Sequence, residues 1–424
     1  MNIKTRLIIM SFLQFAVWGA YLTSMGGYLA SVGIGDNIGW FYSVQGFVSL
    51  FMPGLIGIVA DRWIQAQRLL GFCHFLAAIG MIVVGQIGMN MGNEVTFAQI
   101  FPWYTMSVAF YMPTLALSNS VSYSALEKAG LDTIKAFPPI RIFGTIGFIV
   151  SMWIVDLCGL QHTHAQFSIS AVWSLILGWY AFTLPSCPIK PHAEKKGIVE
   201  ALGLNAFKLF KQRKMALFFL FSMMLGVSLQ ITNGYANPFI SSFAADPAYQ
   251  DAYFTSHANL LISLSQCSET LCILLIPFFL KRYGIKRVML IAMVAWALRF
   301  GFFAIGNPGF PAVTWFILSM IVYGVAFDFF NISGSLFVDQ ETDSGIRSSA
   351  QGLFMMMTNG IGASLGMIVA QGVVNAYTHG QEVEGQFYTV GDWPTVWLIF
   401  AAYALAVGLL FAWIFKYKHT SEKA

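Results

Sequence analysis

Long apolar stretches recur along almost the whole chain, and they limit it to one class of fold. Only 10% of the 424 residues are charged and 57% are hydrophobic, whereas soluble domains carry about 25% charged residues. A helix that crosses a bilayer needs about 20 mostly apolar residues. The sequence therefore predicts an all-α polytopic membrane protein with twelve transmembrane helices, near 7–30, 38–60, 69–90, 98–122, 140–160, 167–187, 215–243, 257–280, 287–306, 311–337, 347–376 and 393–415.

Basic residues lie on one side of the predicted membrane. If the N-terminus is cytoplasmic, the odd-numbered connections between helices contain no Lys or Arg. The two ends and the even-numbered connections carry them, except that the tenth connection lies just before Arg347. Because cytoplasmic loops are rich in Lys and Arg, both termini are expected in the cytoplasm. The formal charge of +4 follows from this distribution and favours no nucleic-acid partner.

The longest polar connection divides the chain into two parts. It covers residues 188–214 and separates an N-terminal six-helix half, 1–187, from a C-terminal six-helix half, 215–424. Faint repetition supports the division, because Arg141 with Phe148 in the first half resembles Arg347 with Phe354 in the second. Two pseudo-symmetric halves are typical of secondary transporters, which handle substrate near the membrane midplane.

Two carboxylates interrupt apolar stretches. Glu269 lies in LISLSQCSETLCILLIPFFL and Asp328 lies in SMIVYGVAFDFFNISGSLF. A charge near the centre of a bilayer costs at least about 2.5–3.5 kcal/mol, so such residues usually serve a function. We therefore expect Glu269 and Asp328 to take part in transport, although structural ion pairing is the alternative.

Polar and aromatic residues share faces of four predicted helices. In helix 5, Arg141, Thr145 and Phe148 are spaced i, i+4, i+7 and so lie on one face. The three other stripes lie in helices 7, 8 and 10 and consist of Gln230 with Asn233, Gln266 with Glu269, and Phe327 beside Asp328. Spacing alone also fits helix packing, in particular for the two Phe residues, and Arg141 could be a cytoplasmic anchor.

Helix 7 is expected to be interrupted. Its sequence LQITNGYANPF contains Gly234 and Pro238, and both residues weaken a helix. Irregular backbone at membrane depth is tolerated only against protein or a water-filled cavity. We therefore expect this part of helix 7 to lie against protein or beside a water-filled cavity.

Carboxylates, amides, a guanidinium and aromatic rings together suit a polar, neutral ring-bearing solute. A nucleoside offers a base that stacks on an aromatic ring, together with hydroxyls that carboxylates and amides can bind. A sugar fits the same residues almost as well. From these residues alone, the two solutes stay open.

The connection after helix 2 reads GIVADRW, with Arg68 beyond it, and resembles the loop motif of the major facilitator superfamily. The matching residues are Gly57, Asp61 and Arg62. We interpret them as gating structure between helices.

Longer segments resemble the bacterial nucleoside:proton symporter family of that superfamily, close to the enterobacterial nucleoside permeases. They include FPPIRIFGTIGF and AFDFFNISGS. The resemblance implies a major facilitator fold, the bacterial cytoplasmic membrane, and alternating-access import of purine and pyrimidine nucleosides by proton symport. It also implies substrate contacts at Arg141, Thr145, Phe148, Gln230, Asn233, Gln266, Glu269, Phe327 and Asp328.

Proton coupling is assigned to Asp328 and Glu269, with Arg141 as their counter-charge. The expected partners are the nucleoside, protons and the lipid bilayer, with no cofactor or metal, and the chain is expected to function as a monomer. A xanthosine-selective permease, a sugar permease and an uncoupled nucleoside facilitator are the alternatives.

Other polar residues in apolar stretches have simpler interpretations. Arg299, Asp156 and His74 are interpreted as interfacial or locally paired residues. GASLG matches the G-x-S-x-G motif of an enzyme nucleophile, but Ser364 lies inside a predicted helix rather than at a strand-to-helix turn. Gly362 and Gly366 there are expected to form a packing face, and the chain is predicted not to be an enzyme.

Overall fold

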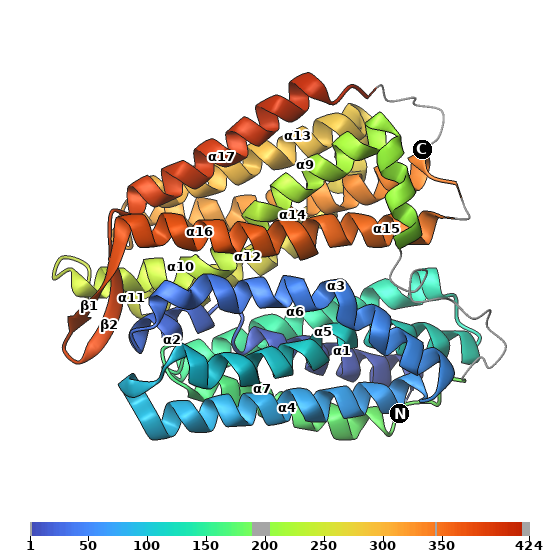
Figure 1. Ribbon diagram of the computed structural model, residues 1–424, viewed down its shortest axis with the longest axis horizontal. Helices are drawn as coiled ribbons and strands as arrows, with labels where there is room; N and C mark the ends of the chain where they lie inside the picture. The colour runs from blue at the N-terminus through green and yellow to red at the C-terminus, as the bar shows by residue number, and fades with distance from the viewer. Residues whose placement is uncertain (1, 189–203, 344–345, 418–424) are drawn as a thin grey trace. The chain divides into compact units, whose positions relative to one another are not determined.

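The computed structural model describes residues 2–188, 204–343 and 346–417, and most of them are helical (Figure 1). The chain forms two compact units, Met1–Leu202 and Gly203–Ala424. Residues 189–203 of the predicted linker lie outside the described residues. The first unit contains α1 (Ile3–Gly19), α2 (Met25–Ser31), η1 (Gly35–Asn37), α3 (Ile38–Arg62), α4 (Ala66–Met91), η2 (Gly92–Glu94), α5 (Phe97–Lys128), α6 (Thr133–Leu157) and α7 (Ala165–Ala181).

The second unit contains more helices and the two described strands. Its elements are η3 (Leu204–Lys211), α9 (Arg213–Leu229), α10 (Ile231–Ser242), η4 (Phe243–Ala245), α11 (Tyr253–Ser256), α12 (Ala258–Ile273), α13 (Ile276–Ile305), α14 (Val313–Glu341), α15 (Arg347–Met355), the π-helix η5 (Met356–Gly362), α16 (Ala363–Tyr377), β1 (Thr378–Val383), β2 (Gln386–Gly391) and α17 (Trp393–Ile414).

Eight helical segments in the described part of the chain are long and apolar enough to cross a membrane. They coincide with eight of the twelve predicted stretches. The other four stretches correspond to α1, α5, α7 and α12, of which α1 and α7 have 17 residues and α12 has 16. The helical membrane protein is confirmed, and the number twelve stays a prediction.

In the first unit, α1 and α6 touch through their backbones. A Cβ atom on Gly147 would lie 2.1 Å from the carbonyl oxygen of Phe12, and one on Gly19 would lie 2.3 Å from that of Phe148. Only glycine permits such an approach. The contact places the helix face that bears Arg141 and Phe148 against α1.

In the second unit, small residues bring α9 against η5 and α16. A Cβ atom on Gly362 would lie 2.3 Å from the carbonyl oxygen of Met223, and one on Gly366 would lie 2.5 Å from Val227 Cα. The predicted packing role of these two glycines is confirmed. Ser364 is fully buried inside helix α16, so the strand-to-helix turn of a nucleophile is absent at this position.

The helices that carry the two acids form one packed group. In this unit α14 packs against both α12 and α13, and Gly324 lets it approach α12, because a Cβ atom there would lie 2.5 Å from the carbonyl oxygen of Ser268. The predicted helix 257–280 is divided, since α12 ends at Ile273 and α13 begins at Ile276 with Pro277 in its first turn. Proline has no N–H to bond the carbonyl oxygen four residues back, here that of Ile273, and its ring clashes with that carbonyl, which explains the break.

The predicted interruption of helix 7 lies earlier than expected. Helix α9 ends at Leu229 and α10 begins at Ile231, so the break falls on Gln230, while Gly234 and Pro238 lie inside α10. Pro238 has no N–H to bond the carbonyl oxygen of Gly234, four residues back, so it weakens the helix on its N-terminal side. The break at Gln230 lies on that side.

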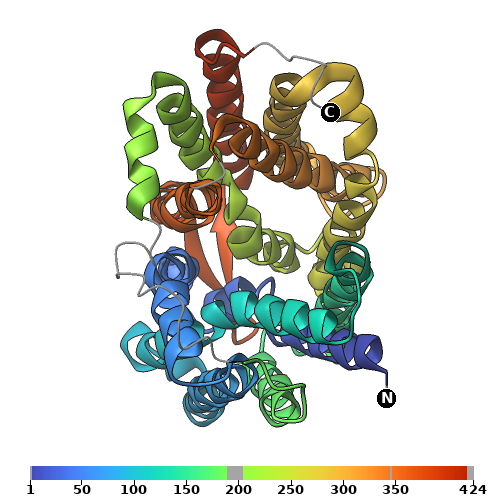
Figure 2. The ribbon, with the colours of Figure 1, turned by 90° about the vertical axis from the view of Figure 1, so that its right-hand side faces the viewer.

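A β-hairpin joins α16 to α17, where the sequence suggested only a loop. Strands β1 and β2 pair antiparallel, with Val383 opposite Gln386. Glu384 and Gly385 between them have φ of 52° and 82°, which fits a tight hairpin turn. Figure 1 shows the hairpin at the ends of α16 and α17, and Figure 2 shows it behind α16 in a view turned by 90°.

Asp392 then caps the N-terminus of α17. It accepts a hydrogen bond from the backbone N–H of Thr395 at 3.1 Å and from the Thr395 hydroxyl at 2.6 Å. These two hydrogen bonds hold the pKa of the Asp392 carboxyl below its usual range. The cap therefore fixes where the hairpin ends and the helix begins.

The contact between α1 and α6 gives a testable expectation. Gly147→Ala places a methyl group against backbone that cannot move aside, and overpacking of this kind costs about 1–3 kcal/mol. We expect the thermal midpoint of the purified protein in detergent to fall by several degrees. Gly372→Ala is the matched control, since nothing lies within 4 Å of a Cβ atom there, and an equal fall in both variants would contradict the assignment.

Candidate functional site

The two predicted acids lie close together at the contact of α12 with α14. Asp328 is 5% exposed, and its Oδ2 atom has no hydrogen-bond partner in the described part of the chain. Glu269 is half-buried and close enough for its charge to act on Asp328. Two carboxyls near enough to interact disfavour double ionisation, so the pair is suited to holding a proton.

Aromatic rings adjoin the acid pair. Tyr323 stacks on Phe327, with ring centroids 5.5 Å apart and planes inclined by 13°. Trp296 meets Tyr323 edge to face at 6.0 Å. Tyr323 also lies within electrostatic range of both Glu269 and Asp328. The predicted Phe327 is therefore one member of an aromatic stack beside the acids.

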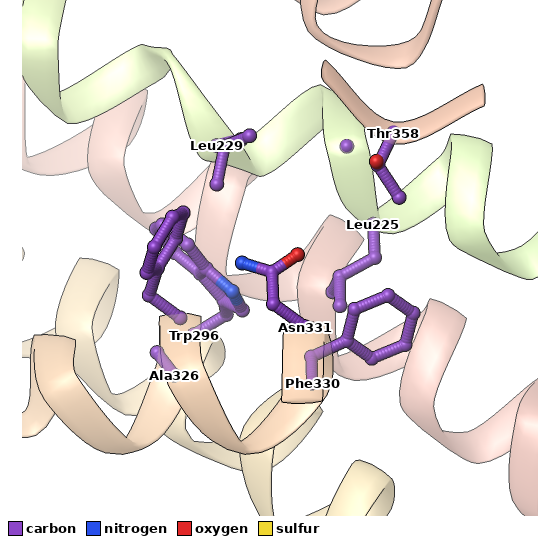
Figure 3. A pocket seen from close by; sticks show the side chains of 9 residues that line it. Leu225, Leu229, Trp296, Ala326, Phe330, Asn331 and Thr358 are labelled. Carbon is purple, nitrogen blue, oxygen red and sulfur yellow. The ribbon is translucent and has the colours of Figure 1, made fainter. Parts of the chain in front are cut away.

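Phe327 also lines a small pocket, which Figure 3 shows from close by. It has an empty volume of about 230 Å³ and is mostly apolar. The Asn331 amide points into it, and Thr358 of the π-helix η5 lies across from it (Figure 3). Its lining residues are Leu225, Gly226, Leu229, Trp296, Ala326, Phe327, Phe330, Asn331 and Thr358.

The predicted amides lie at the end of α9, next to this pocket. Gln230 follows the pocket residue Leu229, and Asn233 donates from Nδ2 to Gln230 Oε1 at 2.9 Å. Both side chains are half-buried. Because the helix is broken at Gln230, the two amides hold each other at an interruption. Gln266, also half-buried, lies one turn before Glu269 on α12.

Three predicted residues belong to α6 in the first unit. The Arg141 guanidinium lies 3.9 Å from the ring centroid of Phe15, and Phe148 meets Trp18 edge to face at 6.3 Å. Thr145 lies between them and is half-buried. Phe148 is only 6% exposed, so in this structure its ring packs against α1.

A buried polar network also ties the first unit together. His74 is hydrogen-bonded at both ring nitrogens, from Nδ1 to Ser174 Oγ at 2.9 Å and from Nε2 to Gln14 Oε1 at 3.0 Å. Gln14 donates in turn to Thr114 Oγ1 at 2.7 Å. The network joins α1, α4, α5 and α7, so local pairing rather than an interfacial position describes His74.

The structure also decides between an interfacial position and local pairing for two other residues. Arg299 is 2% exposed and Asp156 is 1% exposed, so neither side chain reaches the surface of its unit. Arg299 donates from Nη1 to the carbonyl oxygen of Ser319 at 2.7 Å. A long side chain usually extends to the interface, but these hydrogen-bonding groups hold the guanidinium inside.

The predicted gating motif lies at the end of α3. Gly57 lies within the helix and Arg62 ends it, with an exposed side chain. The side chain of Asp61 lies outside the described residues. No group of three or more His, Cys, Asp or Glu residues that could hold a metal occurs in the described part of the chain.

A family model described as nucleoside H+ symporter matches residues 1–420. The chain belongs to this family. It is 49% identical to the xanthosine permease of Escherichia coli K12, over 100% of this chain and 98% of that protein. It is 48% identical to the nucleoside permease NupG of the same organism, over 99% of this chain and 97% of that protein.

A crystal structure of NupG matches with a TM-score of 0.88 and 47% identity, covering 99% of this chain and 100% of that chain. The nucleoside H+ symporter family and the transporter fold of the major facilitator type, both expected from the sequence, are therefore confirmed. That family and both relatives are transporters.

Two residues of the packed group α12, α13 and α14 were not assigned to the candidate site from the sequence. Arg299 was interpreted as an interfacial or locally paired residue, and Tyr323 was not singled out. The usable signal was spacing, because Tyr323 lies one turn before Phe327 and so shares its face. The position of Arg299 beside that face depends on the packing of α13 on α14, which no local pattern reveals.

The paired amides allow a direct test. If the Asn233 amide contacts substrate or holds Gln230 for it, Asn233→Ala should raise the KM of nucleoside uptake about fivefold, equivalent to one hydrogen bond of about 1 kcal/mol. The maximal rate should change little. Asn90→Ala, at an exposed position near the end of α4, is the matched control, and an unchanged KM for Asn233→Ala would remove this pair from the site.

Proposed function

We propose that this protein imports nucleosides across the bacterial cytoplasmic membrane, each coupled to a proton. The observation that carries the proposal is the interacting pair of the half-buried Glu269 and the buried Asp328 in a member of the nucleoside H+ symporter family. A carboxyl group that accepts a proton loses its charge and so becomes far less costly to enclose. Proton binding from outside therefore prepares the pair for the closed state, and proton release inside resets it.

The residues beside the acids supply the substrate contacts in this proposal. Phe327 offers an aromatic face for the base, while Gln230, Asn233 and Gln266 offer donors and acceptors. A neutral polar ligand needs such fixed partners, since it gives up hydrogen bonds to water when it binds. In the first unit, Arg141, Thr145 and Phe148 are proposed as the further contacts that the family resemblance implies.

The membrane arrangement is part of the same proposal. We infer twelve spanning helices in two pseudo-symmetric halves, 1–187 and 215–424, joined by the connection 188–214. Helices α1, α5, α7 and α12 supply the four spans beyond the eight that length and composition identify. Both termini are placed in the cytoplasm, because the basic residues lie in the even-numbered connections. The protein is inferred to work as a monomer in the bilayer by alternating access, without a cofactor and without enzymatic chemistry.

A preference for xanthosine is the second candidate. The chain is as similar to a xanthosine permease, at 49% identity, as to a general nucleoside permease, at 48%. Xanthosine is itself a nucleoside, so the same coupling applies to both. Competition of unlabelled xanthosine, uridine and adenosine against labelled uridine uptake distinguishes a selective permease from a broad one.

The decisive experiment is uptake into proteoliposomes with and without an inward proton gradient. The native protein should accumulate labelled uridine, adenosine or xanthosine above equilibrium only when the gradient is present. Asp328→Asn should lose this accumulation, because an amide cannot carry the proton, while still equilibrating substrate.

Asp36→Asn, at an exposed acid in a connection, is the control and should behave like the native protein. If the native protein only equilibrated the substrate across the membrane, with or without the gradient, it would be an uncoupled facilitator. Full accumulation by Asp328→Asn would remove that acid from the coupling, and uptake of sugars alone would overturn the nucleoside assignment.

A further inference from the structure

Asn331 carries a polar side chain that the proposed transport cycle leaves unused. It lies on α14, four residues after Phe327, so the two side chains share one face of the helix. The Asn331 side chain is half-buried, and its amide makes no hydrogen bond with the described part of the chain. An amide offers two N–H donors and an acceptor oxygen, and enclosing such groups without partners is costly. The Asn331 amide is therefore available to a ligand.

The pocket into which this amide points has mostly aromatic and aliphatic walls (Figure 3). Trp296 comes from α13, Phe327 and Phe330 come from α14, and Leu225 and Leu229 come from α9. None of the described residues that line the pocket is ionisable. Flat apolar walls of this kind favour a flat, uncharged ring.

The remaining wall is formed where α9 meets the π-helix η5. A Cβ atom on Gly226 would lie 2.3 Å from the carbonyl oxygen of Thr358, so the two backbones touch there. The Thr358 hydroxyl donates to the carbonyl oxygen of Phe354 at 2.9 Å, which uses its one proton. The indole of Trp296 can only donate. Asn331 is therefore the lining side chain that offers both a donor and an acceptor to a ligand.

The size of the pocket limits what it holds. Its empty volume is about 230 Å³, below the roughly 300–1,000 Å³ of pockets that hold a whole drug-sized ligand. It therefore suits one part of a nucleoside. A ribose would bring several hydroxyls to apolar walls, and enclosing a hydroxyl without a hydrogen bond is costly. A nucleobase brings two flat faces and confines its polar atoms to the edge of the ring.

Groups that suit the ribose lie next to the pocket rather than in it. Asp328 follows Phe327 in the sequence and Gln230 follows Leu229, but neither Asp328 nor Gln230 lines the pocket. A nucleoside with its base in the pocket therefore leaves its sugar hydroxyls near a carboxyl group and an amide, both of which can bind them.

We propose that Asn331 is a specificity-determining residue that reads the polar edge of the nucleobase in this pocket. The inference rests on the proposed nucleoside transport. The Asn331 Oδ1 atom accepts a hydrogen bond from an N–H of the base, and Nδ2 donates to a neighbouring carbonyl oxygen or ring nitrogen. Uracil and xanthine place an N–H beside a carbonyl oxygen, and adenine places an N–H beside a ring nitrogen, to which asparagine pairs readily. One amide thus serves purines and pyrimidines.

The test compares two competitors of labelled uridine uptake into proteoliposomes under an inward proton gradient. The base of uridine has an N–H between two carbonyl groups, and 3-methyluridine has a methyl group in place of that hydrogen. A site that hydrogen-bonds a group discriminates against an analogue that lacks it. In the native protein, half-inhibition should therefore need about fivefold more 3-methyluridine than unlabelled uridine.

Asn331→Leu replaces the amide by an apolar group of similar size. Half-inhibition by uridine should then need about fivefold more compound than in the native protein, while the value for 3-methyluridine should change little. The ratio of the two concentrations therefore falls about fivefold. Asn90→Leu, at an exposed position near the end of α4, is the matched control and should keep the native ratio.

A role of Asn331 in helix packing alone predicts a different result. Both competitors would then weaken by the same factor in Asn331→Leu, and that unchanged ratio overturns the proposal. If Asn331→Leu does not fold, Asn331→Ser is the second variant, because serine stays polar but is too short to make the same pair of hydrogen bonds. A native ratio in Asn331→Ser overturns the proposal, as does a native protein that inhibits equally with uridine and 3-methyluridine.

A third competitor, 2′-deoxyuridine, distinguishes the base from the ribose. It changes only the sugar, so its half-inhibitory concentration relative to uridine should change about fivefold in Asn331→Leu, in step with the lost contact to the base of uridine only if that base contact is kept in both compounds. Since both compounds carry the same base, their ratio should stay at the native value. A changed ratio would mean that Asn331 contacts the ribose, and the proposal would be wrong.

Failure of this inference is distinguishable from failure of the proposed function. If the native protein takes up no labelled uridine, adenosine or xanthosine, the nucleoside assignment is wrong. If it takes up xanthosine alone, xanthosine and 1-methylxanthosine replace the uridine pair, because xanthine has the same N–H between two carbonyl groups. If native uptake is intact and the Asn331 variants keep the native ratio, only the role of Asn331 is wrong.

Discussion

The cost of enclosing charge is the constraint on which the C-terminal unit depends. Glu269, Asp328 and Arg299 are held in helices that are otherwise strongly apolar, and each would be costly there alone. The packing of α12, α13 and α14 reduces that cost by placing serine oxygens and an aromatic ring next to the cation. Gly324 makes this possible, because its lack of a side chain lets α14 approach Ser268 on α12. The polar chemistry of the unit is thus a consequence of close helix packing.

Most of the architecture could be predicted from the sequence, because the bilayer requires long apolar helices and leaves few alternatives. Apolar length located the helices, and the two acids stood out against that background. The finer boundaries could not be obtained in the same way. The break at Gln230 lies on the N-terminal side of Gly234 and Pro238, and the turn at Leu274 and Leu275 depends on a proline that follows it. Both are backbone effects of neighbouring residues, which an average of hydrophobicity does not contain.

The candidate site shows the same division between local and distant information. Spacing along single helices grouped Gln230 with Asn233, which are hydrogen-bonded to each other in the structure. It also placed Arg141 and Phe148 on one face of α6, and both contact α1. The sequence left Arg299 as either interfacial or locally paired, because a lone arginine in an apolar stretch looks the same from the sequence whether it points outward or inward. Only the partner helices, with Ser265, Ser319 and Tyr323, decide between the two directions.

The backbone contact between α1 and α6 has a consequence for motion. Helices that meet through side chains can slide past each other as those side chains change rotamer, but Gly19 and Gly147 leave no such layer between the two backbones. These helices must therefore move as a single rigid element in any conformational change. Arg141 would then keep its place over Phe15, and Phe148 its place against Trp18, so α6 presents an unchanging polar and aromatic surface through a transport cycle.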